Sequence, residues 1–168
     1  MIRRLVAIVL VGLLGPLAPA MANEPTQIGT FKDWRAYTYK DAGGEICYIV
    51  SEPKKAEGNY TRRGDIYLLV THRPGGKVFD EVSIITGYTY ENGYEPTATV
   101  GSQRFKFYSE GDAAWAFSAD EKKLVDAMKR GANMVVRGKS SRGTVTTDTY
   151  SLSGVTASMQ AIDKACNR

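Results

Sequence analysis

The chain has 168 residues, of which 43% are hydrophobic and 24% charged, and its formal net charge at pH 7 is +4. This length is sufficient for one domain with a real hydrophobic core. The small net charge gives no support to a nucleic-acid-binding role, because such domains concentrate many more basic groups on one face.

The first 22 residues are typical of a cleaved secretory signal peptide. Arg3 and Arg4 form a charged start, residues 5–14 an apolar run, and residues 20–22 (Ala-Met-Ala) a small-x-small cleavage site. The run is too short for a stable membrane span, which needs about 20 residues; a retained membrane anchor is the alternative. Cleavage would leave residues 23–168 as one domain with a net charge of +2 and no transmembrane span. We therefore expect a periplasmic protein, or alternatively an outer-membrane-associated or secreted one.

The segments that follow alternate as β-strands do. Residues 34–40 and 45–51 predict two strands joined by a glycine turn, and the polar, lysine-rich residues 52–64 predict an exposed loop. Further strands are predicted at 65–72, 78–88, 97–100, 104–108 and 113–117. In the last of these strands, Trp115 and Phe117 are expected to point inward.

A helix is predicted to begin at residues 118–121 (Ser-Ala-Asp-Glu), which have the pattern of a capping box. In that motif the Ser118 hydroxyl and the Glu121 carboxylate each accept a backbone N–H. Gly131 is expected to stop the helix in the left-handed conformation. The apolar stripe of this helix would comprise Leu124, Val125 and Met128.

The end of the chain predicts a hairpin followed by a second helix. The hairpin strands are residues 134–137 and 144–152, the second of which is rich in threonine. After Gly154 the spacing becomes helical, with four apolar residues on one face: Val155, Met159, Ile162 and Cys166. Cys166 is therefore expected to point into the protein.

The two cysteines, Cys47 and Cys166, both follow the cleavage site. An exported chain with two cysteines most simply forms one disulfide, here between an early strand and the last helix. Two separately buried thiols are the alternative. A redox-active pair is disfavoured by the absence of Cys-x-x-Cys spacing.

Many strands separated by short turns, without alternating helices, indicate a mainly β, antiparallel sandwich. Several stretches also resemble the invasion-associated locus B family of exported Gram-negative proteins: Asp33-Trp34, Cys47, Trp115 with the following helix, residues 141–144, residues 147–152 and Ile162-Asp163-x-Ala165-Cys166. The resemblance implies an immunoglobulin-like β-sandwich, an extracytoplasmic location and a Cys47–Cys166 bridge. The family name refers to host-cell invasion without specifying a molecular activity, and no family catalytic residues are carried over.

Two clusters are candidate binding surfaces. The basic side chains of Arg137, Lys139 and Arg142, with Arg62 and Arg63 in another loop, could bind anionic lipid headgroups or acidic glycans; ordinary solvated turns are the alternative. The second cluster surrounds the turn at 91–93 and comprises Tyr88, Tyr90 and Tyr94. These rings suit recognition, although tyrosines at strand ends more often cover the core.

Catalytic and metal motifs find little support. The single histidine, His72, has no matching nucleophile motif, and one histidine with two paired cysteines is too few for a zinc site. Asp148 lies among threonines, where a structural role is favoured. The sequence thus predicts a non-enzymatic protein without cofactor or metal that binds another protein or an envelope component; an envelope hydrolase using His72 or Asp148 is the alternative.

Overall fold

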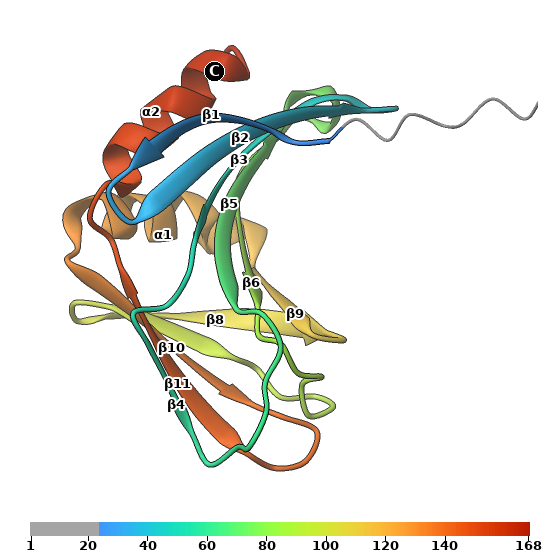
Figure 1. Ribbon diagram of the computed structural model, residues 1–168, viewed down its shortest axis with the longest axis vertical. Helices are drawn as coiled ribbons and strands as arrows, with labels where there is room; N and C mark the ends of the chain where they lie inside the picture. Colours follow the sequence, from blue (N-terminus) through green and yellow to red (C-terminus); the bar gives the residue numbers. More distant parts are fainter. Residues whose placement is uncertain (1–23) are drawn as a thin grey trace, which may run out of the picture.

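A computed structural model describes residues 24–168, and the proposed signal peptide lies outside them. In this part of the chain no helix is both long enough and apolar enough to cross a membrane. Antiparallel strands dominate, with one helix in the middle of the sequence and another near its end (Figure 1). The mainly β, antiparallel class with these two helices is confirmed.

The element bounds, within residues 24–168, are β1 Thr26–Phe31, β2 Trp34–Asp41, β3 Gly44–Ser51, β4 Lys55–Gly58, β5 Tyr67–Arg73, a 3-10 turn Pro74–Gly76, β6 Val78–Ile85, β7 Thr97–Val100, β8 Gln103–Glu110, β9 Ala113–Ala116, α1 Ser118–Arg130, β10 Asn133–Lys139, β11 Val145–Ser151 and α2 Val155–Ala165.

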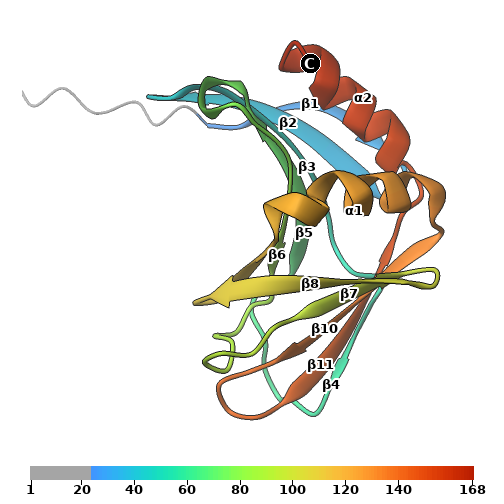
Figure 2. The same ribbon diagram turned by 180° about the vertical axis from the view of Figure 1, so that it is seen from behind.

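The strands form one continuous sheet in the order β1-β2-β3-β5-β6-β9-β8-β7-β10-β11-β4. Strand β8 joins its two halves, because residues 103–106 pair with β7 and residues 107–110 pair with β9. The halves turn toward each other across the core, as Figures 1 and 2 show from opposite sides. The predicted sandwich is therefore built from a single folded sheet.

The core lies on the inner side of the fold and is closed by the helices. Helix α2 packs on β1, β2 and β3, whereas α1 contacts β6 and β8. The largest fully buried side chains include Trp34, Ile49, Leu68, Ile84, Phe107, Leu124, Met128, Met134, Tyr150, Met159 and Ile162. Both predicted helix stripes are buried, which confirms the expected inward direction of Cys166.

The capping box predicted for α1 does not form. The residue before the helix is Phe117, whose carbonyl accepts the Asp120 N–H at 2.8 Å, so Ser118 is already the first helical residue. Gly131 is extended (φ −84°) and not left-handed. A Cβ at Gly131 would lie 2.4 Å from Val100 Cγ1, so glycine is required here by close packing.

The directions expected for Trp115 and Phe117 are also wrong. Ala114 and Ala116 point into the core, while Phe117 is 39% exposed. Trp115 pairs across the sheet with Tyr108 on the outer face, and the two rings stack with centroids 5.7 Å apart. The alternation of β9 thus places the small side chains inward.

The expected loop at 52–64 contains a strand. Residues 55–58 form β4, which crosses to the far edge of the sheet and pairs with β11 from Lys55–Thr149 to Gly58–Thr146. The remainder of the segment then returns to β5, carrying Arg63 into the protein. This crossing builds one wall of the pocket described next.

Candidate functional site

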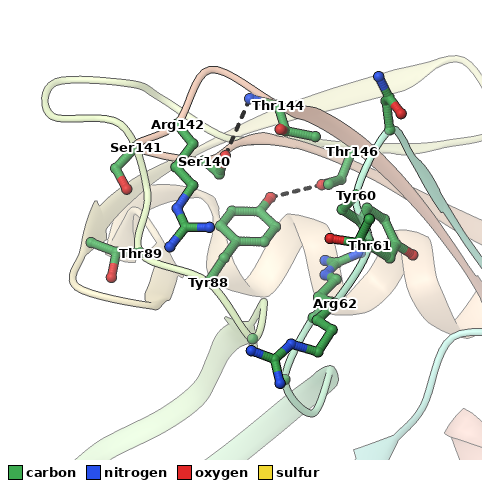
Figure 3. Close-up of a pocket in the computed structure, with 14 residues that line it drawn as sticks. Tyr60, Thr61, Arg62, Tyr88, Thr89, Ser140, Ser141, Arg142, Thr144 and Thr146 are labelled. Carbon is green, nitrogen blue, oxygen red and sulfur yellow. Dashed lines mark hydrogen bonds between the residues drawn. The ribbon is translucent and has the colours of Figure 1, made fainter.

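A polar pocket of about 740 Å³ opens between the segment that follows β4 and the β10–β11 turn (Figure 3). Hydroxyl groups and arginines dominate its lining, which comprises Asn59, Tyr60, Thr61, Arg62, Arg63, Gly64, Gly87, Tyr88, Thr89, Ser140, Ser141, Arg142, Thr144 and Thr146. None of these residues carries a carboxylate. The pocket therefore combines positive charge with many neutral hydrogen-bonding groups.

The β10–β11 turn that carries Arg142 is fixed by its own hydrogen bonds. The Ser140 carbonyl accepts the Gly143 N–H at 2.8 Å, and the Ser140 hydroxyl accepts the Thr144 N–H at 3.2 Å. Gly143 has a φ of +84°, in the left-handed region that favours glycine. The Ser141 N–H donates to the Thr89 carbonyl at 2.8 Å, which ties the turn to the segment after β6.

The opposite wall is held by a buried ion pair between Arg63 and Asp148. Two guanidinium nitrogens of Arg63 donate to the two Asp148 oxygens at 2.6 Å, and Arg63 Nε donates to the Thr86 carbonyl at 2.6 Å. The side chains are only 4% and 1% exposed. Because Asp148 neutralises Arg63, this arginine supports the pocket rather than supplying free charge.

Tyr88 lies between these two walls. Its hydroxyl is 2.7 Å from Thr146 Oγ1, and the Arg63 guanidinium lies 4.9 Å from the centre of its ring. A side chain at Gly138 would collide with the Tyr88 hydroxyl, since a Cβ there would lie 2.2 Å from that oxygen. Burial raises the pKa of Tyr88, so the hydroxyl stays protonated and can donate.

Arg62 and Arg142 provide the uncompensated charge of the pocket. Both are exposed, and neither forms an ion pair with any residue in the range 24–168. In Figure 3 the Arg142 side chain extends from the turn toward Tyr88, while Arg62 comes from the separate segment after β4. The two guanidinium groups leave the pocket ready to accept a negatively charged group.

The structure divides the predicted basic surface. Arg142 lines the pocket, but Arg137 lies in a separate groove with Arg104 and Arg130. Lys139 is ion-paired with Glu91 at 2.8 Å. Of the five basic residues singled out from the sequence, only Arg62, Arg63 and Arg142 come together.

The predicted tyrosine cluster is likewise split. Tyr88 lines the pocket, whereas Tyr90 is only 5% exposed and belongs to the core. Tyr94 packs against that core as a partly buried ring. Tyr90 is therefore not a surface residue, and its backbone bridges to Ser140 in the β10–β11 turn.

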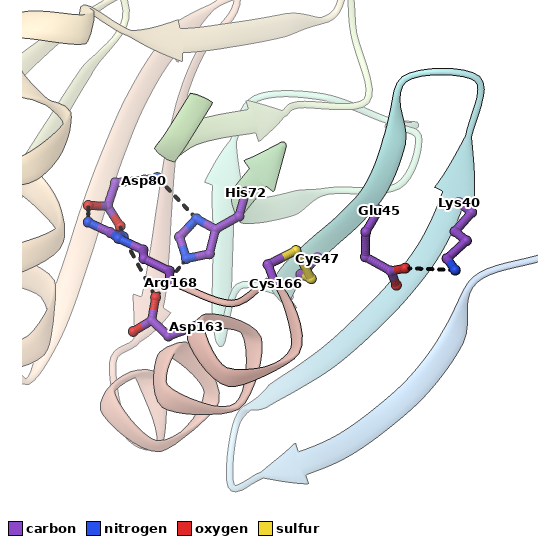
Figure 4. Close-up of a disulfide and its surroundings, with 8 residues drawn as sticks. All are labelled: Lys40, Glu45, Cys47, His72, Asp80, Asp163, Cys166 and Arg168. Atoms are coloured by element: carbon purple, nitrogen blue, oxygen red, sulfur yellow. Dashed lines mark hydrogen bonds and ion pairs between the residues drawn. A yellow bond between two sulfur atoms is a disulfide. The ribbon is translucent and has the colours of Figure 1, made fainter. Parts of the chain in front are cut away.

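His72 is wholly buried beside the cysteines (Figure 4). Its Nδ1 accepts the Asp80 N–H at 3.1 Å, which leaves the proton on Nε2 to be donated to Asp163 at 2.9 Å. Both ring nitrogens are thus used in structural hydrogen bonds. Asp148 is similarly committed to Arg63, so neither hydrolase candidate is arranged as a general base.

Residues 24–168 contain no group of three histidine, cysteine or acidic side chains placed to hold a metal ion. The two cysteines are joined as a disulfide, with Cα atoms 6.1 Å apart. The predicted Cys47–Cys166 pairing is confirmed, and the alternative of two free thiols is wrong.

The sequence profile of the invasion associated locus B (IalB) protein family matches residues 34–163. The chain belongs to the IalB family. A crystal structure of invasion associated protein B from Bartonella henselae has a similar fold, with a TM-score of 0.57 and 13% sequence identity over 85% of this chain and 99% of that one. No curated protein sequence matches.

The part of this IalB-family chain that the profile covers includes the whole polar pocket and Cys47. Cys166 lies three residues beyond it. The resemblance noted from the sequence is therefore confirmed at the level of family and fold. It assigns no role to the pocket, whose chemistry has to be read from its own residues.

Proposed function

We propose that this IalB-family protein is an exported, non-enzymatic binding module that holds an anionic envelope component in the polar pocket. The signal-like first 22 residues and the Cys47–Cys166 disulfide support export to the periplasm or the cell surface, since disulfides persist in oxidising compartments. Residues 23–168 would act as one domain.

The observation that carries this proposal is the unbalanced charge of the pocket. Arg62 and Arg142 both line it, and none of its fourteen lining residues is acidic. Guanidinium groups present several donors in a planar fork that matches carboxylate and phosphate oxygens. A bound anion would supply the counter-charge that the protein itself omits.

The other lining groups favour a saccharide as the carrier of that anion. Six serine and threonine residues and two tyrosines surround the arginines, and hydroxyl groups both donate and accept hydrogen bonds. A sugar presents the same mixture of donors and acceptors. The ligand class is therefore a glycan that carries carboxylate or phosphate groups.

Calorimetry with oligosaccharides tests the proposal. The mature protein should bind a uronic-acid oligosaccharide and should bind a neutral oligosaccharide of equal length much more weakly. Exchanging both pocket arginines (Arg62→Gln with Arg142→Gln) should reduce affinity for the acidic ligand by about tenfold or more, because hydrogen bonds to charged groups contribute about 1.5–3 kcal/mol each.

The matched control removes the same charge outside the pocket, through Arg104→Gln with Arg137→Gln. Its affinity for the acidic oligosaccharide should stay close to that of the parent protein. Equal binding of neutral and acidic oligosaccharides, or equal losses in the two double variants, would contradict a charge-selecting pocket.

A further inference from the structure

A second group of arginines lies on the outer face of strands β8, β7 and β10. There a groove of about 730 Å³ is lined by Thr99, Gly101, Arg104, Arg130, Gly131, Ala132, Asn133, Val135 and Arg137. Its arginines come from three elements: Arg104 from β8, Arg130 from the end of α1 and Arg137 from β10. We call these residues the arginine groove.

Strand alternation explains why the groove faces solvent. In β10 the side chains of Met134 and Val136 are buried, which leaves Val135 and Arg137 on the outside. Thr99 of β7 pairs with both Val135 and Arg104, so it lies between the basic strands β10 and β8. Three neighbouring strands thus present polar or basic side chains to the same outer surface.

The groove contains no counter-charge. None of its lining residues is acidic, and no ion pair within residues 24–168 involves Arg104, Arg130 or Arg137. The nearby lysines differ, since Lys106 is paired with Glu95 and Lys139 with Glu91. Of the three groove arginines, Arg130 lies near one acid, Asp126, which is bonded to Lys122 at 2.9 Å.

Gathering three unpaired cations costs stability through like-charge repulsion, and an anion in the groove would relieve it. The close packing of Gly131 against Val100 and Leu152 holds the end of α1, and hence Arg130, beside the sheet. Thr99 and Asn133 add neutral hydrogen-bonding groups. Arginine forks with such neighbours suit the oxygens of a phosphate group.

The shape of the groove indicates whether a bound phosphate belongs to an enclosed small molecule or to an extended surface. The three cations come from β8, β10 and the end of α1, and their groove is more open to solvent than the pocket at the β10–β11 turn. Strand β11 continues the face with Thr147 and Thr149. Two exposed large hydrophobic residues lie on these strands, Val145 of β11 and Tyr108 of β8, and the Tyr108 ring is stacked on Trp115. The face around the arginines is therefore suited mainly to electrostatic contact.

We propose that the arginine groove docks the protein on the phosphate headgroups of an anionic lipid surface. This site is separate from the polar pocket, and it goes beyond the binding of a glycan there. Basic residues close to an anionic membrane each strengthen binding, and the attraction decays within a Debye length. The expected association is therefore peripheral and reversed by salt.

Vesicle co-sedimentation tests this proposal. The mature protein should bind vesicles of phosphatidylcholine with about 30 mol% phosphatidylglycerol at about 50 mM salt, should bind pure phosphatidylcholine poorly, and should be released by about 300 mM salt. The groove variant Arg104→Gln with Arg137→Gln should lower the partition coefficient by about 30-fold, as expected for two basic residues at the surface.

The charge-matched control is the pocket variant Arg62→Gln with Arg142→Gln, which should keep most of its vesicle binding. Thermal unfolding of both variants checks that they remain folded. Equal losses in the two variants would show that net charge alone drives binding, and absence of binding by the parent protein would overturn the docking site outright.

A third arm separates a lipid surface from a free phosphate. Glycerol phosphate, added in excess over the lipid at constant ionic strength, should displace little of the protein from vesicles. Complete displacement would assign the groove to a soluble phosphate and overturn the membrane role. Because the oligosaccharide test depends on the other pair of arginines, either proposal can fail while the other stands.

Discussion

Arg63 and Asp148 form the most deeply buried ion pair described in residues 24–168, with both side chains less than 5% exposed. The ion pair stabilises the protein because the charged groups of both side chains have their hydrogen-bonding partners. Arg63 donates to both Asp148 oxygens and to the Thr86 carbonyl, and it lies over the Tyr88 ring. Removing one partner would leave the other charge buried without compensation.

The single substitutions Arg63→Met and Asp148→Leu should therefore each destabilise the protein by about 3–5 kcal/mol, whereas the double variant should lose clearly less than their sum. Chemical denaturation of the four proteins in a double-mutant cycle measures this coupling. Additive losses would mean that the two side chains contribute independently despite their contact.

Glu121 gives the protein a distinctive pH dependence. Burial, and then the nearby Glu81 and Asp80 carboxylates, raise the pKa of Glu121 to about 7. Glu81 is ion-paired with Arg73, and Asp80 is ion-paired with Arg168. Glu121 therefore lies near two carboxylates but has no ion pair of its own among the described residues. Folding therefore favours its protonated form.

Since the folded-state pKa lies above the ordinary value of 4.5, this stabilisation is complete below about pH 4.5 and is lost as pH rises through about 7. Glu121→Gln should raise the unfolding free energy at pH 8 by about 1 kcal/mol, allowing for solvent screening, and change it little at pH 4.5. Denaturation curves at both pH values measure the difference. An equal effect of the substitution at both would exclude titration of Glu121 as its cause.

At the scale of single residues, the sequence indicates part of the pocket. Arg142 and Tyr88 stand out because charge and aromatic rings cluster around glycine turns. Arg63 looks like one more loop cation, since its burial depends on a partner 85 residues away. The alternation of the threonine-rich strand β11 places Asp148 on its buried side with Thr146 and Tyr150, and a buried carboxylate there requires a cation to balance it.

Among the elements, α2 depends most on a covalent link. The Cys47–Cys166 disulfide spans 119 residues and fixes the end of this helix to β3. On the chain-entropy account, closing such a loop stabilises the fold by about 4–5 kcal/mol. Burial of both cysteines shields the bridge from solvent reductants.

Cys47→Ser with Cys166→Ser should therefore lower the unfolding free energy by about 4–5 kcal/mol, as measured by denaturant titration. Treating the parent protein with reductant under denaturing conditions should give the same result. If the double variant were as stable as the parent, the loop constraint would contribute nothing to the fold.

The two helices show which local sequence patterns correctly predict the buried face and the ends of a helix. The apolar spacing of α2 predicts its buried face correctly, because the helix packs on β1, β2 and β3 through that face. The start of α1 is predicted one residue too late, since the Phe117 carbonyl takes the first helical bond without help from a side chain. Gly131 is required, but for packing and not for backbone conformation.

For the whole molecule, the class and most strands can be predicted from the sequence, whereas the path of the sheet cannot. Strand β4 is short, polar and exposed, so it lacks the alternation that marks β3 or β5. Its partner β11 lies almost 90 residues later. The pocket depends on this non-local pairing, which is why only one of its walls is apparent in the sequence.

Long-range links of this kind also order the assembly of the protein in time. Three contacts join the first third of the described chain to its last 21 residues: Arg63 to Asp148, the Trp34 indole to the Ser151 carbonyl, and Cys47 to Cys166. Each requires a long loop to close before it contributes, a topology associated with slow folding. During synthesis from the N-terminus, β4, Arg63 and the Cys47 thiol would therefore be made long before their partners. They would stay unpaired until nearly the whole chain had been synthesised.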